Sequence, residues 1–150
     1  MSAADTAHPM KTAAVSIVQR DDGRYLVVWN KRYGGWGFPG GMVEDGESWS
    51  RAQARELREE TCVDTLESAL IYQTSVDGKP NRATHVAFFA VRVHRLSAAS
   101  ARETEMGCPI TWMTYDEVLQ WSPFAAWYRP ALIGHRVFVK SYPSFGVLTG

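Results

Sequence analysis

Apolar and polar residues alternate near the start of the chain in a way that predicts β-strands. Segments 13–19 and 25–29 carry this pattern, and the turn sequence Asp21-Asp22-Gly23 lies between them. We therefore expect these two strands to form a hairpin. The next segment, 34–41, contains five glycines and one proline, which predicts a shaped loop rather than regular structure.

The rest of the chain alternates between helical and extended patterns. Segment 48–61 has neither glycine nor proline and predicts a helix. Further strands are expected at 66–76, 82–94 and 110–113, a polar loop at 97–105 and a short helix at 115–120. Ser122-Pro123 predicts the start of a last helix, broken near Pro130 and resuming to about residue 140. The mixture indicates one α+β domain over residues 1–150, with residues 1–10 as a loose tail.

The helix at 48–61 has two faces of different character. At roughly 100° per residue, one narrow stripe of small or apolar residues could pack on a sheet: Ser50, Ala54, Leu57 and Thr61. Another arc gathers three carboxylates within about one turn: Glu56, Glu59 and Glu60. These acids either form a solvated face or bind a hard divalent cation such as Mg²⁺ or Mn²⁺, which prefers carboxylate oxygens.

Composition narrows the class of protein. The 150 residues include 16 basic and 16 acidic side chains, so binding to nucleic acid through bulk positive charge is not expected. Two cysteines do not make a disulfide scaffold, although one bridge stays possible, and a reducing, cytoplasmic location is predicted. No apolar run reaches the length of a signal peptide or a membrane span. Eight acids fall between residues 44 and 67, where we expect the chemistry.

The acidic helix and the glycines before it resemble a known family. Nudix hydrolases carry the motif G-x5-E-x7-R-E-U-x-E-E-x-G-U, where U is a bulky aliphatic residue. Eight of its nine specified positions match here at the same spacing: Gly41, Glu47, Arg55, Glu56, Leu57, Glu59, Glu60 and Val63. The exception is Cys62, which stands where the motif has glycine after the helix. If this position needs a left-handed backbone, cysteine costs about 1 kcal/mol; otherwise the helix ends differently.

The resemblance implies a fold, an activity and roles for residues. The fold would be an α/β/α sandwich with a mixed sheet between helices. The activity would be hydrolysis of a diphosphate bridge in a nucleotide, with Mg²⁺ or Mn²⁺ as cofactor. By position, Glu56, Glu59 and Glu60 would bind the metal and the Gly40 carbonyl would add a ligand. Glu47 and Arg55 match the structural ion pair of the family.

Further candidate residues lie outside the motif. The general base could be Glu56, or Glu103 or Glu105 in the polar loop. Lys31 and Arg32 could contact phosphates or simply be solvated, and the aromatic side chain of Trp36 could stack on a base. Tyr33 and Phe38 could also stack, and a second aromatic group either lines a base pocket or packs the last helix: Trp121, Phe124, Trp127 and Tyr128.

Three hypotheses for the function follow from this resemblance. The leading one is a MutT-like enzyme that converts a nucleoside triphosphate to a monophosphate and pyrophosphate. The alternatives are a nucleotide-sugar or dinucleotide pyrophosphatase, and a nucleotide-binding regulator without catalysis. In each case the partner is a small nucleotide and not a membrane. Because members of this family are often dimers, a homodimer is a further expectation.

Overall fold

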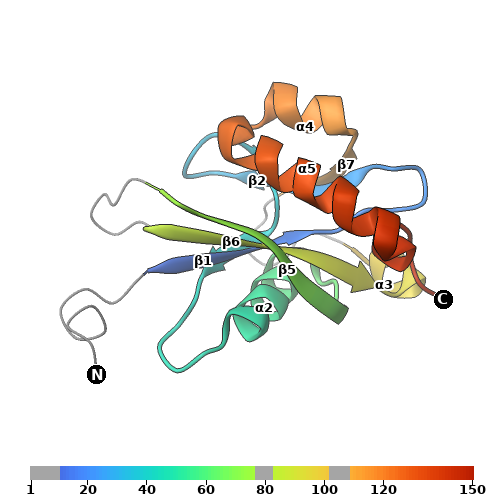
Figure 1. Ribbon diagram of the computed structural model, residues 1–150, viewed down its shortest axis with the longest axis horizontal. Helices are drawn as coiled ribbons and strands as arrows, with labels where there is room; N and C mark the ends of the chain where they lie inside the picture. Colours follow the sequence, from blue (N-terminus) through green and yellow to red (C-terminus); the bar gives the residue numbers. More distant parts are fainter. Residues whose placement is uncertain (1–10, 77–82, 102–108) are drawn as a thin grey trace.

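The computed structural model describes residues 11–76, 83–101 and 109–150. A four-stranded sheet has the order β4-β1-β6-β5, and a three-stranded sheet has the order β3-β2-β7 (Figure 1). The strands are β1 (Thr12–Ile17), β2 (Tyr25–Asn30), β3 (Gly35–Gly37), β4 (Gly40–Met42), β5 (Thr65–Ser75), β6 (His85–Val93) and β7 (Ile110–Met113). The helices are α2 (Trp49–Thr61), α3 (Arg95–Ala99), α4 (Tyr115–Trp121), α5 (Ala125–Ser141) and the 3-10 turn η1 (Pro143–Gly146).

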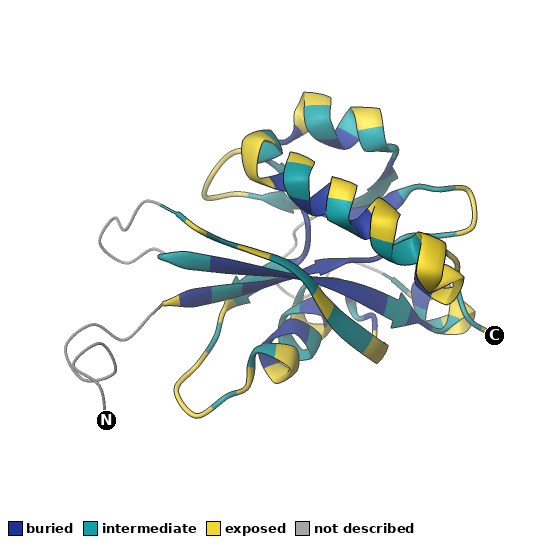
Figure 2. Cartoon of the chain, in the orientation of Figure 1, coloured by how far each residue is buried: buried dark blue, intermediate teal, exposed yellow. Residues whose placement is uncertain are grey.

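Helices cover both faces of the strands. Along β1, Val15 and Ile17 pack with Leu132 of α5, while Ala14 packs on the opposite face with Leu57 of α2. This alternation follows from the two-residue period of a strand and places the buried residues between the helix layers (Figure 2). The four-stranded sheet is mixed, because β1 runs parallel to β6 whereas its other pairings are antiparallel. The predicted α+β sandwich is confirmed.

The prediction that the first two strands form a hairpin is correct only next to the turn and wrong for the rest of the strands. The turn forms, with Gly23 at φ 85°, and the Leu26 N–H donates to the Val18 carbonyl at 3.0 Å. The strands then separate into different sheets. Both edges of β1 are already filled by β4 and β6, so β2 pairs with β3 and β7 instead.

The glycine-rich segment 34–41 also departs from its prediction, because most of it is extended. β3 lies wholly within this segment, and β4 begins in it. Glycine serves here for close approach: a Cβ on Gly35 would lie 2.4 Å from the Pro123 ring, and one on Gly40 would lie 2.7 Å from the Ala14 carbonyl oxygen. Glycine composition alone does not separate a tightly packed strand from a loop.

Helix α2 forms as predicted, but it buries a different stripe. Ser48 caps it, its hydroxyl accepting the Arg51 N–H at 3.2 Å. The buried positions are Ala52, Gln53, Leu57 and Thr61, whereas Ser50 is exposed. The polar Gln53 is tolerated because its amide donates to Ser16 at 2.9 Å and to Thr65 at 3.0 Å, tying the helix to two strands.

The last residues of α2 show what the unusual cysteine does. Cys62 adopts the left-handed conformation, with φ 62° and ψ 17°, and its N–H donates to the Arg58 carbonyl at 2.9 Å. The first of the two expected outcomes at this position therefore holds. A residue with a side chain thus adopts a backbone conformation that glycine adopts without strain.

Replacing this residue by glycine should stabilise the protein. We expect Cys62→Gly to raise the free energy of unfolding by about 0.5–1 kcal/mol, since it removes the left-handed strain and retains the helix-ending hydrogen bond. Urea denaturation measures this change. Cys62→Ala keeps the Cβ and is the control; an equal gain in that variant would contradict the backbone explanation.

The C-terminal part corrects three further predictions. The expected polar loop at 97–105 begins inside a helix, because α3 covers Arg95–Ala99. Ser122 ends α4 instead of capping the next helix, and α5 runs through Pro130 without a break. The proline removes one N–H donor to the carbonyl of Ala126, and because Ala126 is exposed, water can satisfy that carbonyl.

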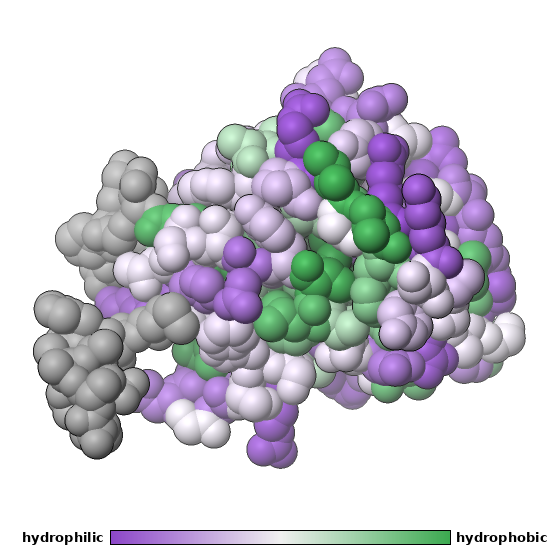
Figure 3. Space-filling view, viewed as in Figure 1, coloured by the Kyte–Doolittle hydropathy of each residue, from purple (hydrophilic) through white to green (hydrophobic). Residues whose placement is uncertain are grey.

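One surface of the molecule exposes several apolar side chains. They lie on α5 and β5 and include Ile133, Val137, Leu66 and Leu70 (Figure 3). In the described part of the chain, no helix has the length and apolar character needed to cross a bilayer.

The structure describes a single copy of the chain, so the predicted homodimer stays a prediction.

Candidate active site

The site begins at β4, which forms one edge of the four-stranded sheet. Gly40 stands opposite Val15 of β1. The neighbouring ladder bonds, Ser16 N–H to the Pro39 carbonyl at 2.8 Å and Val43 N–H to the Thr12 carbonyl at 2.9 Å, make Gly40 a residue whose own polar groups point away from β1. The Gly40 N–H and carbonyl therefore share the outer edge. The reason for glycine here is contact with β1 rather than room for a ligand.

Glu60 reaches this edge from the last turn of α2. Its Oε2 accepts the Gly40 N–H at 2.8 Å, so a helix carboxylate satisfies an otherwise open strand edge. Burial, and then the negative charge of Glu56, raise the pKa of Glu60 to about 8. In the absence of a cation, this carboxyl is therefore largely protonated at neutral pH.

Glu56 lies against the next residue of the same strand. A Cβ on Gly41 would fall 2.4 Å from the Glu56 carboxyl carbon and 2.5 and 2.6 Å from its two oxygens. Only glycine leaves this space open. Burial raises the pKa of Glu56, although the neighbouring Arg55 guanidinium opposes the shift. Two carboxyls that burial disfavours as anions thus lie beside one strand edge.

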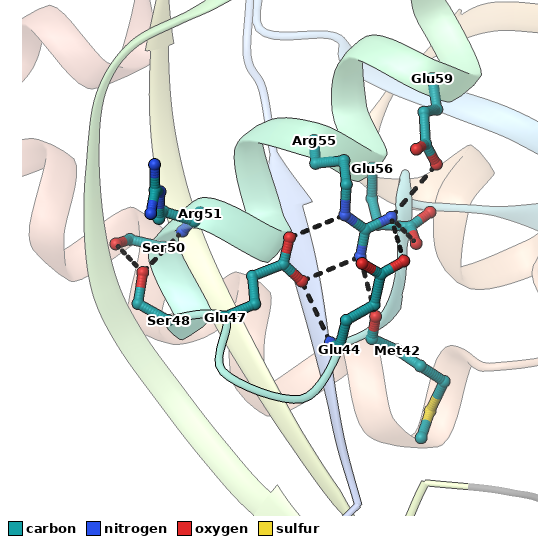
Figure 4. A network of polar contacts seen from close by, with 9 residues as sticks. All are labelled: Met42, Glu44, Glu47, Ser48, Ser50, Arg51, Arg55, Glu56 and Glu59. Atoms are coloured by element: carbon teal, nitrogen blue, oxygen red, sulfur yellow. Dashed lines mark hydrogen bonds and ion pairs between the residues drawn. The ribbon is translucent and has the colours of Figure 1, made fainter.

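Arg55 holds the loop before α2 against the helix (Figure 4). Its Nε and Nη2 donate to both oxygens of Glu47, at 2.8 and 3.0 Å, and Nη2 also donates to the Met42 carbonyl at 3.0 Å. This paired hydrogen bonding is the main reason that the pKa of Glu47 falls to about 2. The third nitrogen, Nη1, donates to Glu56 at 2.9 Å and to Glu59 at 3.2 Å.

The donor groups fit a hard divalent cation in their chemistry. Glu56, Glu59, Glu60 and the Gly40 carbonyl offer only oxygen, and the space at Gly41 admits the Glu56 carboxylate to the strand edge. Within residues 11–76, 83–101 and 109–150, no three acidic, histidine or cysteine side chains converge as a ready ligand set. Arg55 Nη1 instead neutralises Glu56 and Glu59, so a cation would have to replace it.

Comparison with known proteins identifies the family. The family model for the NUDIX domain matches residues 9–133. The chain belongs to the Nudix family. The chain is therefore a hydrolase of the pyrophosphohydrolase class. The match runs far beyond the motif itself and includes the strands on both sides of α2.

Individual relatives agree with this placement. A MutT-like protein of Streptomyces ambofaciens is 30% identical over 114 residues, which cover 75% of this chain and 70% of the relative. An 8-oxo-dGTP diphosphatase of Proteus vulgaris is 40% identical over 58 residues, covering 39% of this chain and 51% of that protein. The MutT NUDIX hydrolase of Burkholderia pseudomallei superimposes with a TM-score of 0.57 at 22% identity, over 77% of this chain and 88% of that one, and shows the fold.

The other predicted residues of this Nudix protein lie in several places. Lys31 and Arg32 are exposed in the turn between β2 and β3, and the Arg32 guanidinium lies 5.7 Å from the centre of the Tyr33 ring. Trp36 on β3 is half-buried and meets Trp29 edge-on, with ring centres 5.4 Å apart. The proposed bases Glu103 and Glu105 lie outside the described residues.

The sequence did not indicate what Tyr128 does in the Nudix fold. The aromatic group that includes Tyr128 was expected either to line a base pocket or to pack the last helix, and the Tyr128 ring is buried in the core. Its phenol oxygen also accepts the Phe38 N–H at 3.0 Å, a contact between residues 90 positions apart. No local pattern reports such a pair, since nothing near either residue fixes where α5 lies.

Proposed function

We propose that this protein hydrolyses a nucleoside triphosphate to a nucleoside monophosphate and pyrophosphate, with Mg²⁺ as cofactor and Mn²⁺ as a substitute. One observation carries the proposal: two half-buried carboxyls of one helix lie at the outward-facing edge of β4, Glu60 accepting the Gly40 N–H and Glu56 filling the space above Gly41. Because a carboxyl must be ionised to bind a metal, a cation held by these two carboxyls would displace protons that burial favours.

The chain's own groups divide the work. Glu56, Glu59 and Glu60 supply the anionic oxygens, the Gly40 carbonyl adds a neutral one, and the Glu47–Arg55 pair keeps the loop and helix in register. Bound Mg²⁺ would neutralise phosphate charge and lower the pKa of a water molecule. The base that accepts the proton of the attacking water is Glu56, or Glu103 or Glu105, because a carboxylate in this role must reach that water within one hydrogen bond.

The substrate class rests on the relatives and on the turn between β2 and β3. Both curated relatives carry names from the MutT group, one of them an 8-oxo-dGTP diphosphatase. Lys31 and Arg32 are the candidates for phosphate contact, and Trp36 for stacking on a base. We further propose a single domain over residues 1–150 that works in the cytoplasm.

A substrate panel tests the function. Canonical and oxidised nucleoside triphosphates, nucleotide sugars, dinucleoside polyphosphates and capped RNA are incubated with Mg²⁺ and, as a control, with EDTA. We expect one monophosphate and one pyrophosphate for each triphosphate consumed. Two monophosphates from a nucleotide sugar or dinucleotide would favour the second enzyme class. Tight nucleotide binding without turnover of any member would indicate a regulator.

A further inference from the structure

The N-terminal part of α5 reaches Phe38, which lies between β3 and β4 and just before the strand that carries the site. Tyr128 is only 6% exposed, and its ring lies 4.4 Å from the Phe38 ring, centre to centre. Its oxygen accepts the Phe38 N–H. A buried peptide N–H without an acceptor is costly, so this phenol satisfies a group that nothing closer in sequence could reach.

The contact is close enough to depend on the residue before Phe38. A Cβ on Gly37 would lie 2.9 Å from the Tyr128 oxygen and 3.3 Å from the Phe124 ring. A side chain at position 37 would therefore push the phenol away from the peptide. Gly37 thus makes the approach of α5 possible, and Tyr128 uses it to form a hydrogen bond.

Phe38 begins a run of three residues that are each anchored to a different element. The Phe38 N–H donates to Tyr128 of α5, and the next residue, Pro39, accepts the Ser16 N–H of β1 at 2.8 Å. The Gly40 N–H then donates to Glu60 of α2 at 2.8 Å. Because the proline ring fixes one of the intervening backbone angles, the chain between Phe38 and Gly40 has less freedom to absorb a displacement at Phe38.

We propose that Tyr128 is a positioning residue, whose phenol oxygen fixes the Phe38 peptide and through it the orientation of the Gly40 peptide at the acidic edge. The inference rests on the proposed function for its consequence, since the Gly40 carbonyl is a proposed metal ligand. It goes beyond that function by giving the C-terminal helix a part in arranging the ligand set. Tyr128 belongs to the core cluster on the α5 side of the sheet, together with Val15 and Leu132.

A matched pair of variants separates positioning from packing. Tyr128→Phe keeps the ring and removes the acceptor. Tyr25→Phe removes a hydroxyl from the same core, at a residue that is 1% exposed and whose ring lies 6.1 Å from the Phe38 ring, but it removes none of the three hydrogen bonds that anchor the run. Amide hydrogen exchange followed by NMR in the metal-free proteins reports on Phe38 and Gly40 directly. Mn²⁺ affinity, measured by electron paramagnetic resonance, reports on the ligand set.

We expect Tyr128→Phe to speed exchange at both Phe38 and Gly40 by about tenfold or more relative to amides in β6, and to weaken Mn²⁺ binding by roughly tenfold. Tyr25→Phe should leave the relative exchange rates of Phe38 and Gly40, and the Mn²⁺ affinity, as they are in the parent protein. Gly37→Ala, which displaces the same phenol, should repeat the exchange result if Tyr128→Phe folds poorly.

The result that overturns the inference is unchanged exchange at Gly40 in Tyr128→Phe, or an equal change in Tyr25→Phe. Mn²⁺ affinity that matches the parent despite faster Gly40 exchange would also overturn it, because the peptide would then have no bearing on the ligands. Failure of the parent protein itself to bind Mn²⁺ contradicts the proposed function instead, and the exchange result still decides the positioning role.

Discussion

Glu60→Gln should lower the rate of nucleotide hydrolysis at saturating Mg²⁺ by at least about a thousandfold. The amide oxygen of glutamine can still accept the Gly40 N–H, and the side chain keeps nearly the same volume. What disappears is an anionic oxygen at the centre of the proposed ligand set. Steady-state turnover of the substrate identified in the panel measures the effect.

The same substitution should stabilise the metal-free protein. The pKa of Glu60 is about 8 in the folded chain and near 4.5 in the unfolded one, so between these values the folded state binds the extra proton. The contribution of Glu60 to stability is fully present below pH 4.5 and is lost as pH rises through about 8. A neutral glutamine at this position has no such loss, and we expect Glu60→Gln to be more stable than the parent by on the order of 2 kcal/mol at pH 7.

Urea denaturation at several pH values in EDTA follows this difference between variant and parent. Subtracting the two curves cancels other groups, including His135, whose burial lowers its pKa to about 4 and makes stability rise from pH 4 to 6.5. Glu67→Gln, at an exposed position of β5, is the matched control and should leave turnover unchanged. Near-normal turnover in Glu60→Gln would refute the ligand role of this residue.

Gly41→Ala is the second change with a large expected effect on activity. The new Cβ would occupy the place of the Glu56 carboxyl, which lies 2.4 Å away at the end of a flexible side chain. Glu56 can rotate away at little cost to folding, but it then leaves the strand edge. We therefore expect turnover to fall by at least about a hundredfold while the free energy of unfolding falls by less than about 1 kcal/mol.

The adjacent residue provides the contrasting control. In Gly40→Ala the Cβ would meet the backbone of β1, 2.7 Å from the Ala14 carbonyl oxygen and 3.0 Å from the Val15 Cα. Backbone atoms of a central strand do not move aside cheaply, so this variant should lose about 2 kcal/mol or more of stability. If Gly41→Ala proves equally destabilising, or fully active, then Glu56 does not need the space above Gly41.

The sequence predicted the parts of this structure that depend on neighbouring residues. Helix α2 follows from an uninterrupted run of good helix formers capped by Ser48, and the spacing of the glutamates places them on one arc. The left-handed backbone at Cys62 was one of two outcomes anticipated from the motif. Each of these features is determined within about one or two helical turns, where local propensity decides.

The errors arise where distant segments decide. The buried stripe of α2 includes Gln53 rather than Ser50, because two hydroxyls on β1 and β5 accept its amide. The expected hairpin separates since β6, which lies far along the chain, takes the free edge of β1. The local sequence pattern contains neither the hydroxyl partners of Gln53 nor the competing strand β6. A prediction based on periodicity therefore cannot choose between alternative buried stripes of a helix or alternative partners of a strand.

The proposed ligands all belong to one short stretch, residues 40–60, whereas the turn at 31–32 and the helix α5 lie in other parts of the fold. Because of this separation, substitutions in the turn at 31–32 or in α5 can change substrate preference during evolution without altering residues 40–60. Tyr128 limits this freedom, because its phenol ties α5 to the peptide next to the ligands. Sequence drift in α5 should therefore be tolerated on its exposed side and selected against at that single hydroxyl.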